Sequence, residues 1–377
     1  MNEQVLADSE LAAASWLRDP LNPDPLDPLA EWFRLHAEIA EAGQPLQLHQ
    51  MLGMLDGLYP VEWIAEPQLQ EFHDVLWLPE QGCLFDGQSG RVLPGTSVSR
   101  FPRHRQLPFE ARQWLELSRP VQSFPRLEQA LWLPRVNGAV FGEWLTEVVA
   151  YLWPLLLESP QELVGLPVLL GDADPDDPLL AELHRLLREQ HLSLLLNQHL
   201  PGALHLERVL VPQPSLRLHA GTSSVWWKSA VALGDRLLAD VEAEPVDKLY
   251  LSRSALPDDR RLITGEEELE QALEASGWTI WHPQQHPLQV QVAALRSAQV
   301  IAGFHGAAWH GLGWIDPDAP KPRLVLLGDR PSLDLMLQLR LQRFEGWYVP
   351  CQEATAAQAE LLEGLIADPS AAEALLG

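Results

Sequence analysis

Residues 248–314 read KLYLSRSALPDDRRLITGEEELEQALEASGWTIWHPQQHPLQVQVAALRSAQVIAGFHGAAWHGLGW. Short apolar runs at Leu249–Ser252, Trp278–Trp281 and Val300–Ala302 predict three strands. Two helical patterns lie between them and begin at Glu266 and at Leu288. Strands that alternate with helices of roughly ten residues predict a parallel sheet with right-handed crossovers. The fold class that we expect is therefore α/β.

The third predicted strand runs into Gly303-Phe304-His305-Gly306-Ala307. A glycine-flanked turn between a strand and a helix is where parallel sheets bind ligands. Gly306 and Ala307 are small, so backbone N–H groups there can approach an oxygen-rich ligand, and the following helix would add its positive dipole end. His305 can donate to a phosphate or a sugar hydroxyl. The alternative is a tight turn that holds a core histidine.

Ser252 and Arg253 stand where the first predicted strand ends. In a parallel sheet this end faces the ligand crevice, and a guanidinium there can bind a diphosphate through two hydrogen bonds. The alternative is an ordinary surface arginine. Arg261 follows Asp258 and Asp259, so it either forms local salt bridges or contacts a phosphate.

Three separated motifs in this stretch resemble the C-terminal half of glycosyltransferase family 61. They are Tyr250-Leu251-Ser252-Arg253, the Arg260-Arg261 turn before Glu266, and the His305-Gly306-Ala307 turn. The resemblance implies two Rossmann-like domains that face a cleft, an arrangement called GT-B. It also implies an inverting, metal-independent transfer of a sugar from a nucleotide-sugar, with a UDP-sugar favoured, to a hydroxyl of a glycan or another acceptor. The donor-binding residues would be Ser252, Arg253, Arg261, Gly303, His305, Gly306 and Ala307.

The segment Phe141-Gly142-Glu143-Trp144-Leu145-Thr146-Glu147 resembles the Tyr-Tyr-His-Trp-Leu-x-Glu segment of the same family. Glu143 stands where the family has histidine. Glu147 or Glu143 would be the general base, because a carboxylate in a closed cleft can have a raised pKa. The alternatives are two solvated helix glutamates, or a degenerate transferase that acts as a binding or scaffold protein.

A second departure follows the His305-Gly306-Ala307 turn. The family's next strand commonly ends in Val-Glu-Ile, whereas this chain has Leu324 to Gly328 followed by Asp329. The family's glutamate is expected near the donor ribose. We expect Asp329 to take its place.

Composition excludes several classes of partner. The chain has 377 residues and a formal net charge of -26 at pH 7, which disfavours nucleic acid and anionic membrane surfaces. Cys83 and Cys351 are too few for a disulfide framework, and no motif indicates a metal site. The first residues lack a basic n-region, and no apolar stretch reaches the roughly twenty residues of a membrane span. We expect a cytoplasmic protein without a cofactor, and the oligomeric state stays open.

The predicted organisation has four parts. They are a Pro/Asp-rich arm at 1–28, an acceptor-side domain at 29–244, a nucleotide-sugar-binding domain at 245–350, and a C-terminal helix at 351–377. The second part should begin with helices and a small β-meander, followed by a long apolar-faced helix over Phe141–Leu157.

Overall fold

The computed structural model describes residues 34, 38–39, 43–58, 62–63, 65–78, 83–93, 96, 120–133, 142, 144–158, 161–170, 178–189, 191–196, 202–217, 221–239, 245–257, 263–329 and 332–367. The predicted arm at 1–28 lies outside them. Contacts divide the chain into two compact units. Unit 1 comprises Met1–Pro25 and Glu62–Ser229, and unit 2 comprises Leu26–Val61 and Ala230–Gly377. The assignment of functional domains to the four predicted ranges stays a prediction.

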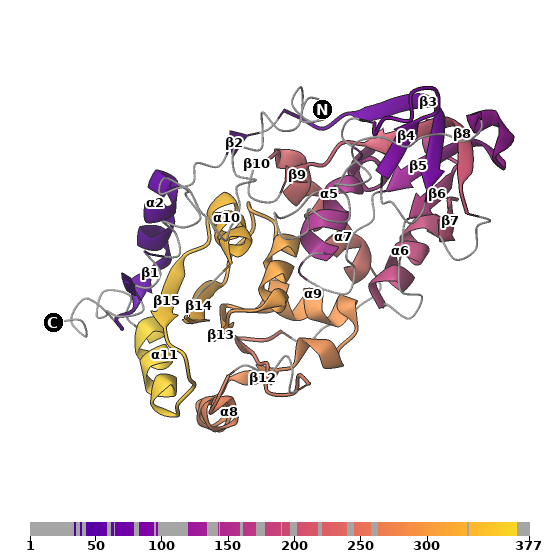
Figure 1. Ribbon diagram of the computed structural model, residues 1–377. Coiled ribbons are helices and arrows are strands. Elements are labelled where there is room, and N and C mark those ends of the chain that lie inside the picture. Colours follow the sequence, from indigo (N-terminus) through magenta and orange to yellow (C-terminus); the bar gives the residue numbers. More distant parts are fainter. Residues whose placement is uncertain are drawn as a thin grey trace. The chain divides into compact units, whose positions relative to one another are not determined.

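The described part of unit 2 contains a six-stranded sheet in the order β1-β15-β14-β13-β11-β12 (Figure 1). Its strands are β1 (Leu46–Gln47), β11 (Lys248–Leu251), β12 (Thr279–Trp281), β13 (Val300–Phe304), β14 (Arg323–Gly328) and β15 (Gly346–Pro350). Strands β11 to β15 are mutually parallel, and β1 pairs antiparallel with β15. The strand order reverses between β11 and β13, since β12 lies on one side of β11 and β13 on the other. The predicted α/β class is confirmed.

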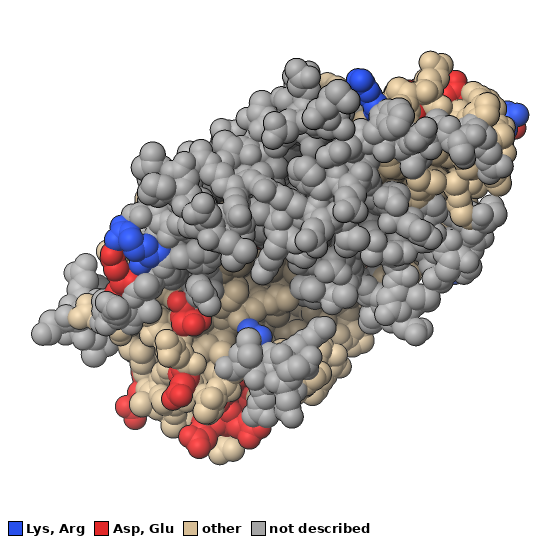
Figure 2. Space-filling model, viewed as in Figure 1, with Lys and Arg blue, Asp and Glu red and all other residues tan. Residues whose placement is uncertain are grey.

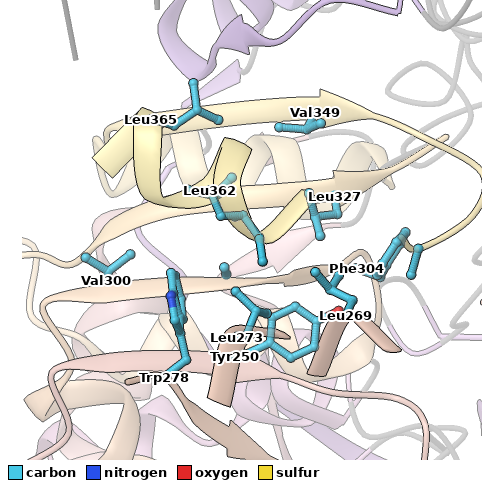
Figure 3. Packing of buried hydrophobic residues seen from close by; sticks show 14 of the residues in the cluster. Tyr250, Leu269, Leu273, Trp278, Val300, Phe304, Leu327, Val349, Leu362 and Leu365 are labelled. Atoms are coloured by element: carbon cyan, nitrogen blue, oxygen red, sulfur yellow. The ribbon is translucent and has the colours of Figure 1, made fainter. Parts of the chain in front are cut away.

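Helices cover both faces of this sheet. They are α2 (Leu48–Leu58), α8 (Glu266–Ala275), η8 (Pro283–Gln285), α9 (Leu288–Ser297), η9 (Ala307–Trp314), α10 (Leu333–Leu341) and α11 (Ala357–Ala367). Helices α8 and α11 share one face with a buried cluster of unit 2, in which Tyr250, Phe304 and Val349 of the sheet meet Leu269 and Leu362 of the helices (Figure 3). Helices α9 and α10 both contact η9.

Two details at the end of β13 differ from the sequence-based prediction. The strand was expected to end at Ala302, but Gly303 and Phe304 continue it by pairing with Leu326 and Leu327 of β14. The helix that follows is a tight 3₁₀ helix over Ala307–Trp314. Both differences bring the turn at His305 and Gly306 to the very end of the strand.

Unit 1 has its own six-stranded sheet in the described residues, in the order β4-β3-β8-β5-β6-β7, and a small sheet β2-β10-β9. The strands are β2 (Glu62–Trp63), β3 (Leu69–Leu78), β4 (Cys83–Asp86), β5 (Arg126–Leu133), β6 (Pro167–Leu170), β7 (Ser193–Leu196), β8 (Leu204–Pro212), β9 (Leu216–Arg217) and β10 (Gly221–Thr222). Strands β8, β5, β6 and β7 are parallel, whereas β3 and β4 are antiparallel. The predicted small β-meander is found as the antiparallel pair β3 and β4, which forms one side of the main sheet.

The helices of unit 1 are η3 (Val121–Ser123), η4 (Trp144–Val148), α5 (Val149–Tyr151), η5 (Pro154–Glu158), η6 (Gln161–Leu163) and α6 (Pro178–Glu189), and α7 (Ser224–Leu238) spans the boundary between the units. The prediction of one regular helix over 141–157 is wrong. Two π-helical turns, η4 and η5, flank the short α-helix α5, which ends at Tyr151. Pro154 lacks the N–H that would continue the helix, and Thr146 donates its hydroxyl to the carbonyl of Gly142, a bond that bends helices.

No helix in the described parts of either unit combines the length and the apolar character that crossing a membrane requires.

An ion pair at the amino end of β11 fastens α11 to the sheet. Lys248 Nζ lies 2.7 and 2.8 Å from the two carboxylate oxygens of Glu363, and the indole N–H of the buried Trp278 donates to the same carboxylate at 2.6 Å. The Lys248 ammonium also lies 5.7 Å from the centre of the Trp278 ring. One acidic side chain of α11 therefore satisfies two donors from different segments.

We expect Glu363→Ala to lower the free energy of unfolding by about 1–3 kcal/mol, because it removes charge-assisted hydrogen bonds and leaves the buried Trp278 N–H without its acceptor. Urea unfolding followed by tryptophan fluorescence measures the change. Glu360→Ala, an exposed change in the same helix, should cost less than about 0.5 kcal/mol. Equal effects of the two substitutions would contradict the assignment.

Candidate active site

Two predicted donor-binding residues, Arg253 and His305, meet at the carboxyl ends of β11 and β13. Arg253 is the second residue after β11, and His305 directly follows β13. The Arg253 guanidinium donates through Nη1 to the carbonyl oxygen of His305. These strands flank the point where the strand order reverses, which is the ligand-binding position of open parallel sheets.

Gly306 leaves room for the Arg253 side chain. A Cβ on Gly306 would lie 3.1 Å from Nη1 of Arg253 and 3.5 Å from its Cδ and Cζ. The guanidinium thus lies against the backbone of the predicted phosphate-binding turn. Ala307, the first residue of η9, is exposed beside it. The turn and the arginine side chain therefore lie in direct contact.

Gly303 serves the packing of the sheet. It is buried within β13 with φ +155, and a Cβ there would lie 2.6 Å from the carbonyl oxygen of Leu251. Only glycine adopts this backbone conformation easily at such a close approach. Its place among the ligand contacts stays a prediction.

Ser252 is tied to the turn that carries Arg253. Its side chain is 3 % exposed. The hydroxyl donates to Oε1 of Glu270 and accepts from the backbone N–H of Ser254 at 3.0 Å. Its backbone N–H donates to the carbonyl of Trp281 at 2.8 Å. These contacts give Ser252 a role in shaping the turn, and its predicted contact with the donor stays a prediction.

Glu266 supports the same turn from α8. One carboxylate oxygen, Oε1, accepts the backbone N–H of Arg253 at 3.0 Å and the hydroxyl of Tyr250 at 3.2 Å. The side chain is fully buried. Burial and the negative charge of Glu270 raise the pKa of Glu266, although the Arg253 backbone and Tyr250 bonds act in the opposite sense. Burial also raises the pKa of Tyr250 well above its ordinary value, which keeps its hydroxyl a donor.

His305 joins β13 to the start of α10. Its ring Nε2 lies 3.0 Å from the backbone nitrogen of Ser332, whose N–H donates to it. Ser332 in turn caps α10 by accepting the N–H of Leu335 at 3.2 Å. Because Nε2 accepts, the neutral imidazole carries its proton on Nδ1.

Asp329 lies at the same edge of the sheet as His305. It is exposed and directly follows β14, and a Cβ on the preceding Gly328 would lie 3.5 Å from Cβ of His305. The carbonyl of Gly328 accepts the hydroxyl of Tyr348 at 2.8 Å. The position fits the proposed replacement for the family's ribose-binding glutamate.

In unit 1, Glu147 lies in the π-helical turn η4 with its side chain almost fully buried, at 7 % exposure. The alternative of a solvated helix glutamate therefore does not hold for this residue. π-Helical turns occur often at functional sites, where they reposition a side chain. Glu143 and Arg261 lie outside the described residues, so their predicted roles stay predictions.

Tyr250, Glu270 and Ser332 have contacts at this site that sequence reasoning missed. The sequence does indicate that two glutamates of α8 face the sheet. The spacing expected for the buried face of a helix is followed by Glu266, Leu269, Glu270 and Leu273. Glutamate at such positions indicates a hydrogen-bonded partner on the sheet.

Among the residues that the structure describes, no cluster of three or more His, Cys, Asp or Glu side chains could hold a metal ion.

The doubly wound order of the unit 2 sheet, with an arginine at its switch point, is that of an α/β protein, and open sheets of this class bind ligands at this edge. The family model described as Glycosyltransferase 61 matches residues 141–320. This segment is thus a glycosyltransferase family 61 domain, and the protein is a glycosyltransferase. The resemblance inferred from the motifs is confirmed. No curated protein matches the chain at a significant level.

The raised pKa of Glu266 makes stability depend on pH. The folded protein holds this proton to a higher pH than the unfolded chain, whose glutamate titrates near 4.5. The contribution to stability is therefore complete below about pH 4.5 and is lost as the pH rises through the folded pKa. Glu266→Gln does not titrate, so its free energy of unfolding should fall less between pH 4.5 and neutrality than that of the wild type.

Urea unfolding at a series of pH values measures this slope. Glu268→Gln, an exposed change in the same helical turn, should keep the wild-type slope. If the Glu266 variant keeps the wild-type slope as well, the buried carboxyl is not the group responsible.

Proposed function

We propose that this glycosyltransferase moves a sugar from a nucleotide-sugar, with a UDP-sugar favoured, to a hydroxyl of a growing glycan or related acceptor. The observation that carries the proposal is the contact of the Arg253 guanidinium with the His305-Gly306 turn at the switch point of the sheet. A diphosphate bound there would meet a permanent positive charge and the first N–H groups of η9, which lack acceptors within a helix.

The proposed reaction is a single inverting displacement. The acceptor oxygen attacks the anomeric carbon while its proton passes to a carboxylate base, and the bond from the anomeric carbon to the diphosphate oxygen breaks. Arg253 would stabilise the charge that develops on the departing diphosphate, a task that a metal ion performs in other transferases. His305 would donate a hydrogen bond to a phosphate or sugar oxygen.

Glu147 or Glu143 would act as the base on the acceptor side. The burial of Glu147 supports this, since a carboxylate held away from water is a stronger base. The base and the donor site would then belong to two different Rossmann-like domains, as in a GT-B arrangement. A cytoplasmic location is proposed from the low cysteine content.

Calorimetric titration of the purified protein with UDP, GDP, CMP and their sugar conjugates tests the donor site. We expect one nucleotide to bind, and Arg253→Ala to weaken it by about 10–100-fold through loss of a charge-assisted contact. His305→Ala should weaken it as well. Arg323→Ala removes the same charge from the opposite edge of the sheet, at the start of β14, and should leave the affinity unchanged.

Turnover separates an active enzyme from a degenerate one. Once the donor is identified, Glu147→Gln should retain donor affinity and lower kcat by at least about 100-fold, as expected for loss of a general base. Donor binding without hydrolysis or transfer in the wild type would favour the degenerate alternative. No binding of any of the nucleotides would contradict the donor site itself.

A further inference from the structure

Glu266 occupies a position that has no simple packing explanation. Its carboxyl is fully buried, its partners are the Tyr250 hydroxyl and the Arg253 backbone, and Oε2 has no hydrogen-bond partner among the described residues. The nearest acidic neighbour, Glu270, has the same charge and raises the energy of the ionised form. Burying a carboxyl is unfavourable unless it is hydrogen-bonded, so its bonds to these two donors account for its place.

We propose that Glu266 is a positioning residue, which fixes the backbone of the Ser252-Arg253-Ser254 turn and thereby aims the Arg253 guanidinium at the donor diphosphate. The inference rests on the proposed function for the identity of the ligand. Its geometric part, the fixing of the turn, stands on the contacts alone.

The turn is held at both ends of Arg253. On one side, α8 supplies two acids one helical turn apart, of which Glu266 binds the Arg253 N–H and Glu270 binds the Ser252 hydroxyl. On the other side, the guanidinium donates to the His305 carbonyl over Gly306. A flexible arginine would lose conformational entropy about several rotatable bonds on binding a diphosphate, whereas an arginine fixed beforehand loses little entropy.

Contacts with a neighbouring segment fix the start of α8 and therefore the position of Glu266. Its N-cap, Gly265, has φ +79, and a Cβ there would lie 2.2 Å from the carbonyl oxygen of Ala354. The backbone N–H of Ala354 donates to the carbonyl of Thr264 at 2.8 Å. The segment between β15 and α11 therefore sets where the carboxylate lies.

The first measurement is hydrogen exchange at the Arg253 amide, which needs no ligand. Glu266→Ala removes the acceptor, and the amide should exchange at least about 10-fold faster, while amides in β13 keep their rates. Glu266→Gln keeps an acceptor oxygen and should retain most of the protection. Tyr250→Phe removes the other donor to the same oxygen and should leave Arg253 protected.

The second measurement is the UDP dissociation constant in a double-mutant cycle with Arg253→Ala. Glu266→Ala alone should raise the UDP dissociation constant by about 10-fold or more. The same substitution should have little further effect once Arg253 is replaced. Glu266→Gln should stay within about 3-fold of the wild type. Glu268→Ala, an exposed acid of the same turn, is the matched control. If Glu266→Ala does not fold, Glu266→Met keeps the volume without the acceptor.

The outcomes are distinct. An unchanged Arg253 amide in the Ala or Met variant overturns the positioning role, whatever the ligand is. Equal losses of UDP affinity in the wild-type and Arg253→Ala backgrounds also overturn it, since they show that Glu266 acts independently of Arg253. If wild-type protein binds none of the nucleotides, the proposed function fails, and the exchange result alone decides whether Glu266 fixes the turn.

Discussion

The backbone at Gly303, where β13 pairs with β11, is the constraint on which the proposed donor site depends. At Gly303 the two strands come so near that a methyl group would collide with the carbonyl of Leu251. Arg253 and His305, which follow the carboxyl ends of these strands, are therefore within hydrogen-bonding reach of one another. A larger residue at 303 would separate the strands at the point where the sheet reverses its order, and the arginine would lose its anchor.

The electrostatics of the site are local. The chain has a formal net charge of -26, and acidic side chains gather on the end of unit 2 that carries α8 and α11 (Figure 2). Such a surface repels an anionic donor at long range. At physiological ionic strength this repulsion is screened beyond about 8 Å, whereas a direct contact with a guanidinium is not. One well-placed arginine can thus bind a diphosphate on an acidic protein.

The sequence predicted the strands and helices of unit 2 well, because their apolar periods are clear. The helix over Leu288–Ser297 is found as expected. The interruption of the helix near Pro154 was missed, since its apolar pattern continues across the proline. The pairing of Glu266 with the backbone of Arg253 was also missed. This pairing depends on which face of α8 packs on the sheet. Because α8 begins with three consecutive glutamates, the sequence does not indicate which of them is buried.

The structure also gives a physical reason why a Tyr-x-Ser-Arg strand end is followed by an acidic helix. Tyr250 and Ser252 donate their hydroxyls to Glu266 and Glu270, and Arg253 donates its backbone N–H to Glu266. The alternate residue Leu251 points to the other face of the sheet and takes no part, as the strand period requires. The strand end and the first helical turn are therefore one hydrogen-bonded unit, in which a change on either side leaves a buried polar group without its partner. The strand end and the acidic start of α8 together hold Arg253 in place.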